Sequence, residues 1–219
     1  MLLDDAILER HSSRVYLPTP VPRRVLERAL ALAAHAPSHT NTQAWQLFVV
    51  TGDALSRLKT DLAAAALAGP PNVRPLPAAF EEHHHELGRV LYGEGWGLAR
   101  GDREGRRAAV LRNFAFFGAP AALVVCAPTS LDGDGAGGAL SVGMHLQTLL
   151  LALTAAGVGS CVEVSVAGYA DVVRHAVGIP DDMTVLVGVA VGFEDAGAQV
   201  NRVRMGRDPV ERHTVWVGE

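Results

Sequence analysis

Hydrophobic residues recur at helical spacing in several parts of this chain. In residues 22–35 a proline stands at the front, and the apolar side chains that follow share one face of a helix: Val25, Leu26, Ala29, Leu30 and Ala33. A second helix has Asp53 as its candidate N-cap and ends near Gly69. The same kind of pattern predicts further helices over residues 4–10, 80–92, 102–116 and 170–177.

Short apolar runs predict the strands of a sheet. They lie at residues 46–51, 121–127, 160–166 and 185–193. Four prolines in residues 70–77 predict an irregular connection, and the glycine-rich residues 132–138 predict a flexible loop. Strands and helices mix without strict alternation, so the sequence predicts a single α+β domain over residues 1–219.

One apolar stretch, residues 139–157, is nearly uncharged and long enough to suggest a membrane span. His145, Gln147 and Thr148 lie within it, and the mean hydropathy of the chain is a modest +0.19. A helix that is apolar on nearly all sides either crosses a membrane or lies at the centre of a large core. We interpret this stretch as a core helix and expect no membrane association.

Composition narrows the class of protein. A chain of 219 residues can bury roughly 70% of its unfolded surface in one core. The formal net charge of −4 and the pI near 6.1 argue against a nucleic-acid-binding protein. Cys126 and Cys161 stand far apart in apolar runs, so we expect reduced core residues in a cytoplasmic protein. No apolar stretch follows a basic start, so we expect no signal peptide.

A short segment near the N-terminus carries the first chemical signal. Arg10, His11, Ser12, Ser13 and Arg14 bring two guanidiniums and two hydroxyls together without an acid among them. Arginine binds phosphate oxygens in pairs, and hydroxyls donate to the remaining lone pairs. The segment therefore predicts a site for a phosphate dianion and for the polar edge of an attached ring.

Two further segments strengthen this signal. Residues 36–45 (APSHTNTQAW) lie between a predicted helix and a predicted strand, and residues 207–211 (RDPVE) stand near the C-terminus. In this order and at these distances the three segments resemble the FMN-dependent nitroreductase family, in particular its branch that reduces nitroaromatic compounds and nitrobenzoate. Smaller matches, within a resemblance that covers residues 4–217, are Gly101-Asp102-Arg103, Asn113-Phe114, Phe117, Ala119-Pro120, Gly143-Met144, Gln147, residues 178–182 and Asn201-Arg202.

The resemblance implies an α+β fold in which helices flank a mixed sheet, and it implies an intertwined homodimer. The C-terminal segment of the family crosses to the partner subunit and extends its sheet, and residues 214–217 are strand-like here. The alternative that the residues leave open is a frayed tail.

The resemblance also assigns the arginines. Arg10, Ser12 and Arg207 match phosphate ligands, and Arg14 matches the cation beside the pyrimidine edge of the flavin. The four-residue spacing lets Arg10 hold the phosphate while Arg14 reaches along the ribityl chain. His11 is either a further donor to the cofactor or a packed histidine.

A second set of matches implies contacts from the other subunit. Pro37, Ser38 and His39 match the segment that packs against the flavin across the dimer, and a proline there turns the chain away from the helix. Asn41, followed by Gln43, either reaches the flavin or holds this turn by side-chain hydrogen bonds. Ala44 replaces a proline that is usual in the family. Gln147 is a further cofactor contact that the resemblance implies.

Val164 and Ser165 match the positions whose backbone amides face N5 and O4 of the flavin. Just before them, this chain has Val162-Glu163 where close relatives have Pro-Gln. Glu163 is either a substrate-facing acid or a solvent-facing one. Near the C-terminus Met205 occupies a position that is often basic, although Arg204 adjoins it.

The implied function is reduction of nitroaromatic compounds, quinones or similar small acceptors by NADH or NADPH, in a ping-pong reaction. No catalytic side chain is expected, because N5 of the flavin carries the chemistry and solvent supplies protons. Residues 75–97 vary most in the family and are expected to shape the substrate pocket, unless their aromatic residues only pack the helix. The alternatives are a flavin-dependent dehydrogenase or oxidase of a biosynthetic intermediate, and a non-catalytic flavin-binding protein.

Two other chemistries lack support. His83, His84 and His85 are consecutive, and neighbours on a helix diverge by about 100°, so the three cannot converge on one metal ion. We therefore expect no metal site. The chain also lacks the Gly-x-Ser-x-Gly sequence that marks the nucleophile of many hydrolases.

Overall fold

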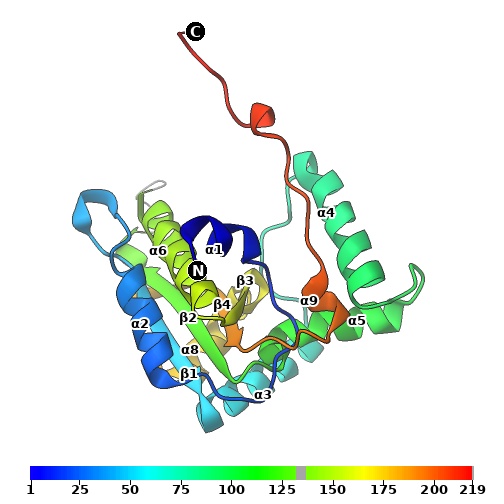
Figure 1. The fold of residues 1–219 in the computed structure, drawn as a ribbon. Helices are drawn as coiled ribbons and strands as arrows, with labels where there is room; N and C mark the ends of the chain where they lie inside the picture. Colours follow the sequence, from blue (N-terminus) through cyan, green and yellow to red (C-terminus); the bar gives the residue numbers. More distant parts are fainter. Residues whose placement is uncertain (132–136, 219) are drawn as a thin grey trace.

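The computed structural model describes residues 1–131 and 137–218. Its centre is a four-stranded sheet in the order β1 (Gln46–Thr51), β2 (Ala121–Pro128), β4 (Met183–Gly192) and β3 (Gly159–Glu163) (Figure 1). Neighbouring strands are antiparallel. An isolated parallel bridge from Ser12 to Ser160 places the N-terminal segment at the β3 edge, outside the four antiparallel strands.

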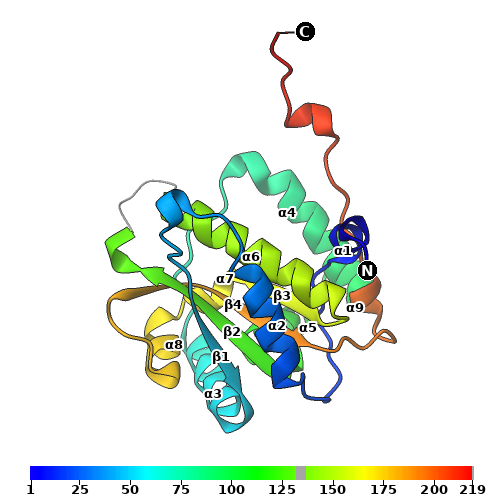
Figure 2. The ribbon, with the colours of Figure 1, turned by 60° about the vertical axis from the view of Figure 1, so that its left-hand side comes forward.

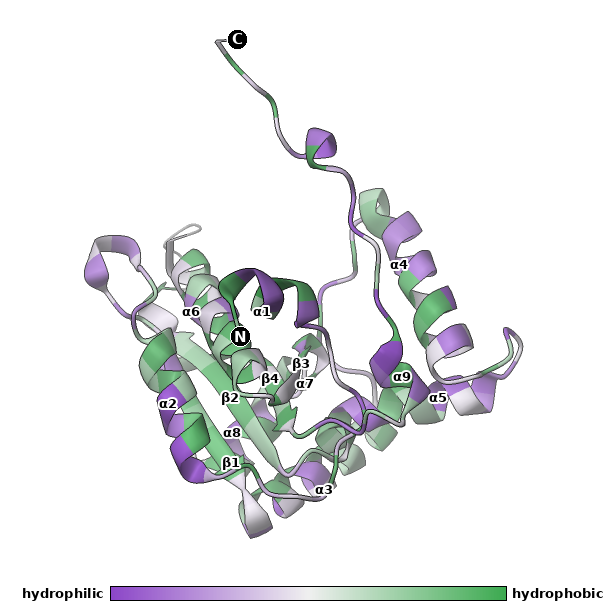
Figure 3. Cartoon of the chain, viewed as in Figure 1, coloured by the Kyte–Doolittle hydropathy of each residue, from purple (hydrophilic) through white to green (hydrophobic). Residues whose placement is uncertain are grey.

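The central strand β2 is buried on both faces. Figure 3 shows it as hydrophobic along its length. A strand with helices over both faces needs apolar residues at every position, which explains why its sequence shows no polar alternation. Successive residues of β2 enter two different cores, with Ala122, Val124 and Cys126 on one face and Ala121, Leu123, Val125 and Ala127 on the other.

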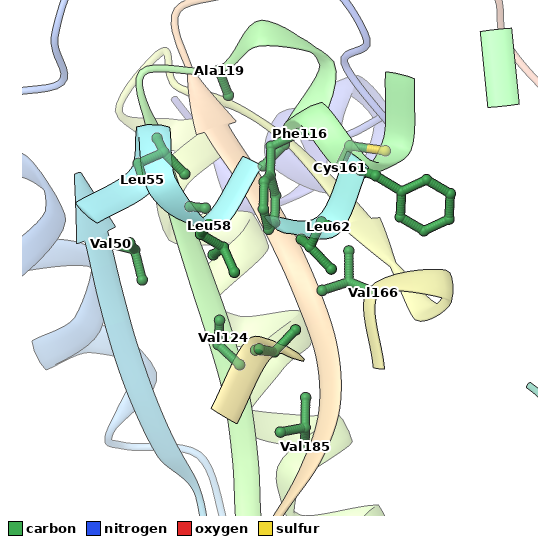
Figure 4. Packing of buried hydrophobic residues seen from close by; sticks show 14 of the residues in the cluster. Val50, Leu55, Leu58, Leu62, Phe116, Ala119, Val124, Cys161, Val166 and Val185 are labelled. Carbon is green, nitrogen blue, oxygen red and sulfur yellow. The ribbon is translucent and has the colours of Figure 1, made fainter. Parts of the chain in front are cut away.

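The first face of the sheet is covered by α3 (Gly52–Ala68), α8 (Ala170–Val177) and the 3₁₀ segment η4 (Arg112–Gly118) (Figure 2). Figure 4 shows Leu58, Leu62 and Phe116 packed together in this core, and none of the three has exposed surface. Phe116 adopts a left-handed φ of 48°, which is rare for a bulky residue, and the burial of its ring offsets the backbone cost.

The second face is covered by α2 (Arg23–Ala33) and α6 (Gly137–Ala155), which pack against each other. By length and composition alone α6 could cross a membrane. In this structure 39% of its most apolar window is buried, and the helix contacts α1, α2, β2 and β3. The helix therefore packs against the sheet on one side, and the rest of that window is not buried within the single chain.

The remaining elements lie around these layers. α1 (Leu3–Glu9) rests on α6, and α4 (Glu81–Gly88) continues into a π-helical segment, η3 (Arg89–Gly95). Figure 1 shows α4 beside the C-terminal segment, which then leads away from the body of the protein. The other short elements are α5 (Arg103–Leu111), α7 (Val164–Ala167), α9 (Gln199–Arg202), η1 (His39–Asn41), η2 (Ala78–Phe80), η5 (Thr129–Leu131) and η6 (Val210–Arg212).

The structure confirms the predicted α+β class and most of the predicted elements, including β1 and α8 at their predicted bounds. Several boundaries differ. The helix predicted over residues 102–116 ends at Leu111, and the one predicted over residues 80–92 becomes π-helical from Arg89. Asp53 is not an N-cap, because Thr51 at the end of β1 takes that position and Asp53 lies in the first turn. The loop predicted over residues 132–138 lies largely outside the described residues, and Gly137 already belongs to α6.

The end predicted for one strand is wrong. The strand predicted over residues 160–166 ends at Glu163, where pairing with β4 stops, and α7 begins at Val164. Apolar, β-branched residues on both sides of this boundary concealed the change. In the single chain, residues 214–217 are exposed and form no strand, so their pairing with the sheet of a partner subunit stays a prediction. An isolated tail has no neighbouring strand to supply the hydrogen bonds that a sheet requires.

Gly178 provides a small, well-defined test of the fold. It ends α8 with a left-handed φ of 75°, and a Cβ placed there would meet nothing within 4 Å. We expect Gly178→Ala to lower the free energy of unfolding by about 1–2 kcal/mol through backbone strain alone. Gly88→Ala is the matched control, because Gly88 also faces open space but has a helical φ of −61°. Urea unfolding should show that the control is neutral or slightly stabilising, and equal losses in both variants would contradict the interpretation.

Candidate functional site

The N-terminal segment is held tightly along the edge of the sheet. We call residues 10–16 the strap. The Ser13 amide donates to the Ser160 carbonyl at 2.9 Å, and the Ser13 hydroxyl donates to Oε2 of Glu194 at 2.7 Å. A Cβ on Gly159 would lie only 2.5 Å from the Ser13 hydroxyl, so the strap can approach β3 this closely only over a glycine. The strap therefore has a fixed position beside β3.

A buried amide joins the strap to the C-terminal segment. The Oδ1 atom of Asn201 accepts from the backbone amides of Arg14 at 2.7 Å and Val15 at 3.2 Å. Its Nδ2 atom donates to the carbonyls of Val15 at 2.7 Å and Asp195 at 3.0 Å. Asn201 is 2% exposed. Because all four contacts are to backbone groups, this one side chain fixes how the two ends of the chain approach each other.

The approach brings Arg10 and Arg207 near enough for their charges to interact. Burial lowers the pKa of Arg10, and the nearby charge of Arg207 lowers it further. Arg207 is exposed, and its Nη1 atom donates to the carbonyls of Met205 and Gly206 at 3.0 Å and 2.9 Å. Neither guanidinium forms a salt bridge with a carboxylate in the described part of the chain. Two like charges gathered without a counter-ion are suited to bind an anion.

The pKa of Cys161, a buried residue of β3, depends on several residues of the strap. Burial raises the pKa of its thiol to about 12, and the charge of Arg14 is the largest effect that opposes this rise. Glu163 raises the pKa further, while a hydrogen bond with Ser12 and the charge of Arg10 lower it. The strap residues predicted to contact the cofactor therefore converge over the end of β3.

Arg14 is a half-buried residue of the strap that faces η4. Its Nη1 atom donates to the Ser12 carbonyl at 3.2 Å, and its guanidinium carbon lies 5.9 Å from the centre of the Phe117 ring. This cation forms no salt bridge with a carboxylate among the described residues. It is therefore positioned to stabilise a negative charge that develops on a bound ligand.

Val164 and Ser165 follow β3 as the first residues of α7. The first backbone N–H groups of a helix have no acceptor within the helix. Val164 is 60% exposed, so this turn lies at the surface rather than in the core. We predict that these residues donate backbone N–H groups to the flavin. The start of a helix offers such free N–H groups.

Glu163 is the most unusual group near the site. It is 2% exposed, and neither carboxylate oxygen has a hydrogen-bond partner. Burial raises its pKa well above the usual value, and the charges of Arg14 and then Lys59 oppose that rise. The solvent-facing interpretation of Glu163 is therefore wrong. The sequence did not indicate its burial, because a glutamate is almost never fully buried unless it is paired.

His11 has both ring nitrogens close to oxygen atoms of the protein. Its Nδ1 atom lies 2.7 Å from the Glu9 carbonyl, and its Nε2 atom lies 2.8 Å from Oε2 of Glu194. These contacts tie α1 to the segment that follows β4. They fit the packed alternative for His11.

Residues 37–41 form a turn far from the strap. The His39 amide donates to the Ser141 hydroxyl at 3.1 Å, the Gln43 amide donates to the Ser38 hydroxyl at 3.0 Å, and the Gln43 side chain donates to Oδ1 of Asn41 at 3.3 Å. Thr40, Asn41 and Gln43 have positive φ values of 48°, 59° and 47°. Side-chain hydrogen bonds therefore hold a turn in which three residues have left-handed backbone conformations.

The strap and this turn lie at opposite ends of α6 (Figures 1 and 2). Ser141, which contacts the turn, stands near the start of α6, whereas Ser160, which contacts the strap, follows its end. The helix between Ser141 and Ala155 spans roughly 20 Å at 1.5 Å per residue. Gln147 lies exposed between these ends. Within one chain, the structure brings Arg10, Ser12, Arg14 and Arg207 together but keeps Pro37, Ser38, His39 and Asn41 apart from them.

One histidine of α4, His83, takes part in a different cluster. His83 Nε2 lies 3.2 Å from Oδ2 of Asp208, and Arg212 and His213 contact the same carboxylate at 3.4 Å and 3.8 Å. Within the described residues no three acidic, histidine or cysteine side chains form a candidate metal site. Asp208 adjoins Arg207, so α4 helps to hold the C-terminal segment near the site.

Two residues that support the site had weak signals in the sequence. Asn201 belongs to one of the smaller matching motifs, but its contacts depend on segments that are remote in sequence. Lys59, on α3, donates to the Ala119 carbonyl at 2.7 Å and lies close enough to Glu163 for their charges to interact. A single lysine on a predicted helix carries no indication of such a position.

The sequence of this chain is similar to those of known proteins. The model of the nitroreductase family matches residues 7–193. The chain is 31% identical to the chloronitrobenzene nitroreductase of Comamonas testosteroni over 99% of this chain and 97% of that protein. It is 32% identical to the 4-nitrobenzoate reductase of Nocardioides sp. (strain LMS-CY), over 97% of this chain and 89% of that protein.

Solved structures agree with these relatives. The FMN- and NADPH-dependent nitroreductase NfnB from Sphigopyxis sp. strain HMH superimposes with a TM-score of 0.94 at 31% identity, over 100% of both chains. The FMN-dependent NfnB of Mycobacterium smegmatis, in complex with NADPH, gives a TM-score of 0.89 at 30% identity, over 98% of this chain and 97% of that chain. The fold and the sequence therefore point to the same group of proteins.

Proposed function

This chain belongs to the nitroreductase family, and from that premise we propose that it is an FMN-dependent oxidoreductase. In this proposal NADH or NADPH donates electrons, and a nitroaromatic compound, a quinone or a similar conjugated molecule accepts them. The observation that carries the proposal is the convergence of Arg10 and Arg207 beside Ser12, without a carboxylate partner, at the edge of the sheet.

The residues present fit the cofactor. Arg10, Ser12 and Arg207 would hold the phosphate, because their guanidiniums and hydroxyl match its charge and its oxygen acceptors. Arg14 would lie at the pyrimidine edge. Arg10 and Arg207 repel each other, and a phosphate dianion bound between them would remove that repulsion.

A homodimer explains why the matched residues form two separate groups. The turn at residues 37–41 lies at the far end of α6 from the strap, beyond the reach of any side chain. In a dimer related by a two-fold axis, the turn of one subunit can meet the strap of the other, so each site is completed by its partner. The exposed segment that includes Trp216 would then find its cover on the partner subunit.

When bound, FMN supplies the centre that accepts a hydride and passes electrons on. The protein's residues bind and orient it. The Arg14 guanidinium stabilises negative charge at the pyrimidine edge, and the free N–H groups at the start of α7 offer hydrogen bonds. Reductant and acceptor would use the same slot in turn, and protons would come from solvent. The buried free thiols of Cys126 and Cys161 favour a cytoplasmic location.

The proposal predicts a yellow protein. Purified protein, loaded with FMN if necessary, should lose its visible absorbance when NADH or NADPH is added without oxygen, and a nitroaromatic compound should restore the absorbance. A protein that takes up no FMN contradicts the proposal. Bound FMN that neither nicotinamide reduces indicates a non-catalytic flavoprotein, and substrate-dependent oxygen uptake without a nicotinamide indicates an oxidase.

A further inference from the structure

Glu163 presents an ionisable group that the proposed chemistry does not use. Its carboxyl group is almost fully buried at the end of β3, and both oxygens lack a hydrogen-bond partner. Buried carboxyl groups are normally hydrogen-bonded or paired, since desolvation strongly disfavours the charged form. A carboxyl group without partners beside a binding site is therefore a candidate for a functional role.

The position of Glu163 follows from the pairing of β3 with β4. Glu163 stands opposite Gly188, and directly opposed residues of an antiparallel pair project to the same face. A Cβ on Gly188 would lie 3.0 Å from both Phe116 and Val166, so Gly188 faces the core under η4 and α7. Glu163 therefore projects to that face, and the missing side chain at Gly188 leaves room for it.

Charged and titratable groups surround Glu163 on several elements. The strap contributes Arg14 and Tyr16, β3 contributes Cys161, and α3 contributes Lys59. The η4 segment contributes aromatic rings, with Phe117 beside Arg14. The Lys59 ammonium is already held by the Ala119 carbonyl at 2.7 Å, and neither cation forms a salt bridge with Glu163. Glu163 thus acts on Arg14 through space and not through a hydrogen bond.

We propose that Glu163 is a positioning residue that regulates, through Arg14, the positive charge that the flavin edge experiences. This inference rests on the proposed function. In its ionised form Glu163 offsets the Arg14 guanidinium, and in its protonated form it leaves that charge free to act on the flavin. In the low dielectric of the core, this difference is large enough to influence a ligand that contacts Arg14.

The coupling is reciprocal. Added negative charge on reduced FMN would favour the protonated form of Glu163, and protonation of Glu163 would favour reduced FMN by the same factor. At high pH, removal of the ionisable group should therefore make the protein bind reduced FMN more tightly relative to oxidised FMN. At low pH the removal should have little effect, because Glu163 is already protonated. A purely structural role for the side chain predicts no such pH dependence.

The test compares wild type with Glu163→Gln, which keeps the shape of the neutral acid. The midpoint potential of bound FMN is measured between pH 6 and 9 in the complete flavoprotein. At the alkaline end of this range, where the largest fraction of wild-type Glu163 is ionised, we expect the variant to favour reduced FMN over oxidised FMN about tenfold more than wild type, or about 30 mV for a two-electron couple. The difference should shrink toward pH 6. Glu163→Asp retains the charge and should retain the pH dependence, and Glu104→Gln, at an exposed position of α5, should match wild type.

A second measurement needs no FMN. Because burial raises the pKa of Glu163, the folded ligand-free protein binds this proton more tightly than the unfolded chain does. Its contribution to stability is therefore present below the unfolded pKa of about 4.3 and is lost as the pH rises toward the folded value. Glu163→Gln should remove this loss, so the variant should gain stability relative to wild type as the pH increases.

The possible results separate the two proposals. If the flavoprotein is yellow and NADPH reduces it, but wild type and Glu163→Gln have the same potential at every pH, the role of Glu163 is overturned and the proposed function stands. A lower potential in the variant at the alkaline end of the range, or an unchanged pH profile of unfolding, also overturns it. A chain that takes up no FMN overturns both.

Discussion

Arg10→Ala is expected to weaken FMN binding by a factor between roughly 10 and 150. One charge-assisted hydrogen bond contributes about 1.5–3 kcal/mol, and a tenfold change corresponds to about 1.4 kcal/mol. The ligand-free protein should change little in stability, by about 1 kcal/mol at most, because the substitution also removes the repulsion from Arg207. Titration of ligand-free protein with FMN, followed by fluorescence quenching, measures the first effect, and urea unfolding measures the second.

The matched control is Arg23→Ala. Arg23 is an exposed arginine at the start of α2 that pairs with Glu27, remote from the strap. It should leave the dissociation constant of FMN unchanged. Arg207→Ala should resemble Arg10→Ala, since both guanidiniums serve the same phosphate in the proposal. If both variants bind FMN as tightly as wild type, the phosphate assignment is wrong even when the protein is a flavoprotein.

Asn201→Ala is expected to lower the free energy of unfolding by roughly 3–5 kcal/mol. The substitution removes four hydrogen bonds and leaves the amides of Arg14 and Val15 and the carbonyls of Val15 and Asp195 without their partner. A buried group without a partner costs about 1–3 kcal/mol, and water that enters the gap recovers part of the total. FMN binding should weaken as well, because Asn201 holds the strap against the segment that carries Arg207.

Asn113→Ala controls for the general effect of losing an asparagine. Its Nδ2 atom makes a single local bond, at 2.7 Å, to the carbonyl of Val110 three residues earlier. Urea unfolding should show a loss of about 1 kcal/mol or less. Similar losses in the two variants would show that Asn201 does not join the two ends of the chain in the way that its contacts indicate.

The elements of the fold were largely predictable, and the exceptions have physical causes. The helical pattern located α2, α3 and α8, and a long uncharged apolar run located α6, because each of these helices buries apolar residues against the sheet. The pattern could not locate the end of β3, since Val162, Val164 and Val166 alternate with polar or small residues on both sides of it. The last bond to β4, and not the local sequence, decides where that strand stops.

The candidate site was predictable as a set of chemical groups but not as an arrangement. Arginine and serine residues indicated a phosphate site from their chemistry alone, and the ordered motifs indicated the family. The sequence did not indicate that the turn at residues 37–41 and the strap lie at opposite ends of α6. That separation depends on how far one helix extends across the sheet.

By itself, the sequence determined which residues are apolar, which carry charge and which family they match, because these properties belong to single residues and short segments. The tertiary structure alone decided that Asn201 joins two remote segments, that Arg10 meets Arg207 and that Glu163 is buried without a partner. Contacts between residues almost 200 positions apart, and the desolvation of a carboxyl group, arise only when the whole chain packs. Local patterns carry no record of either.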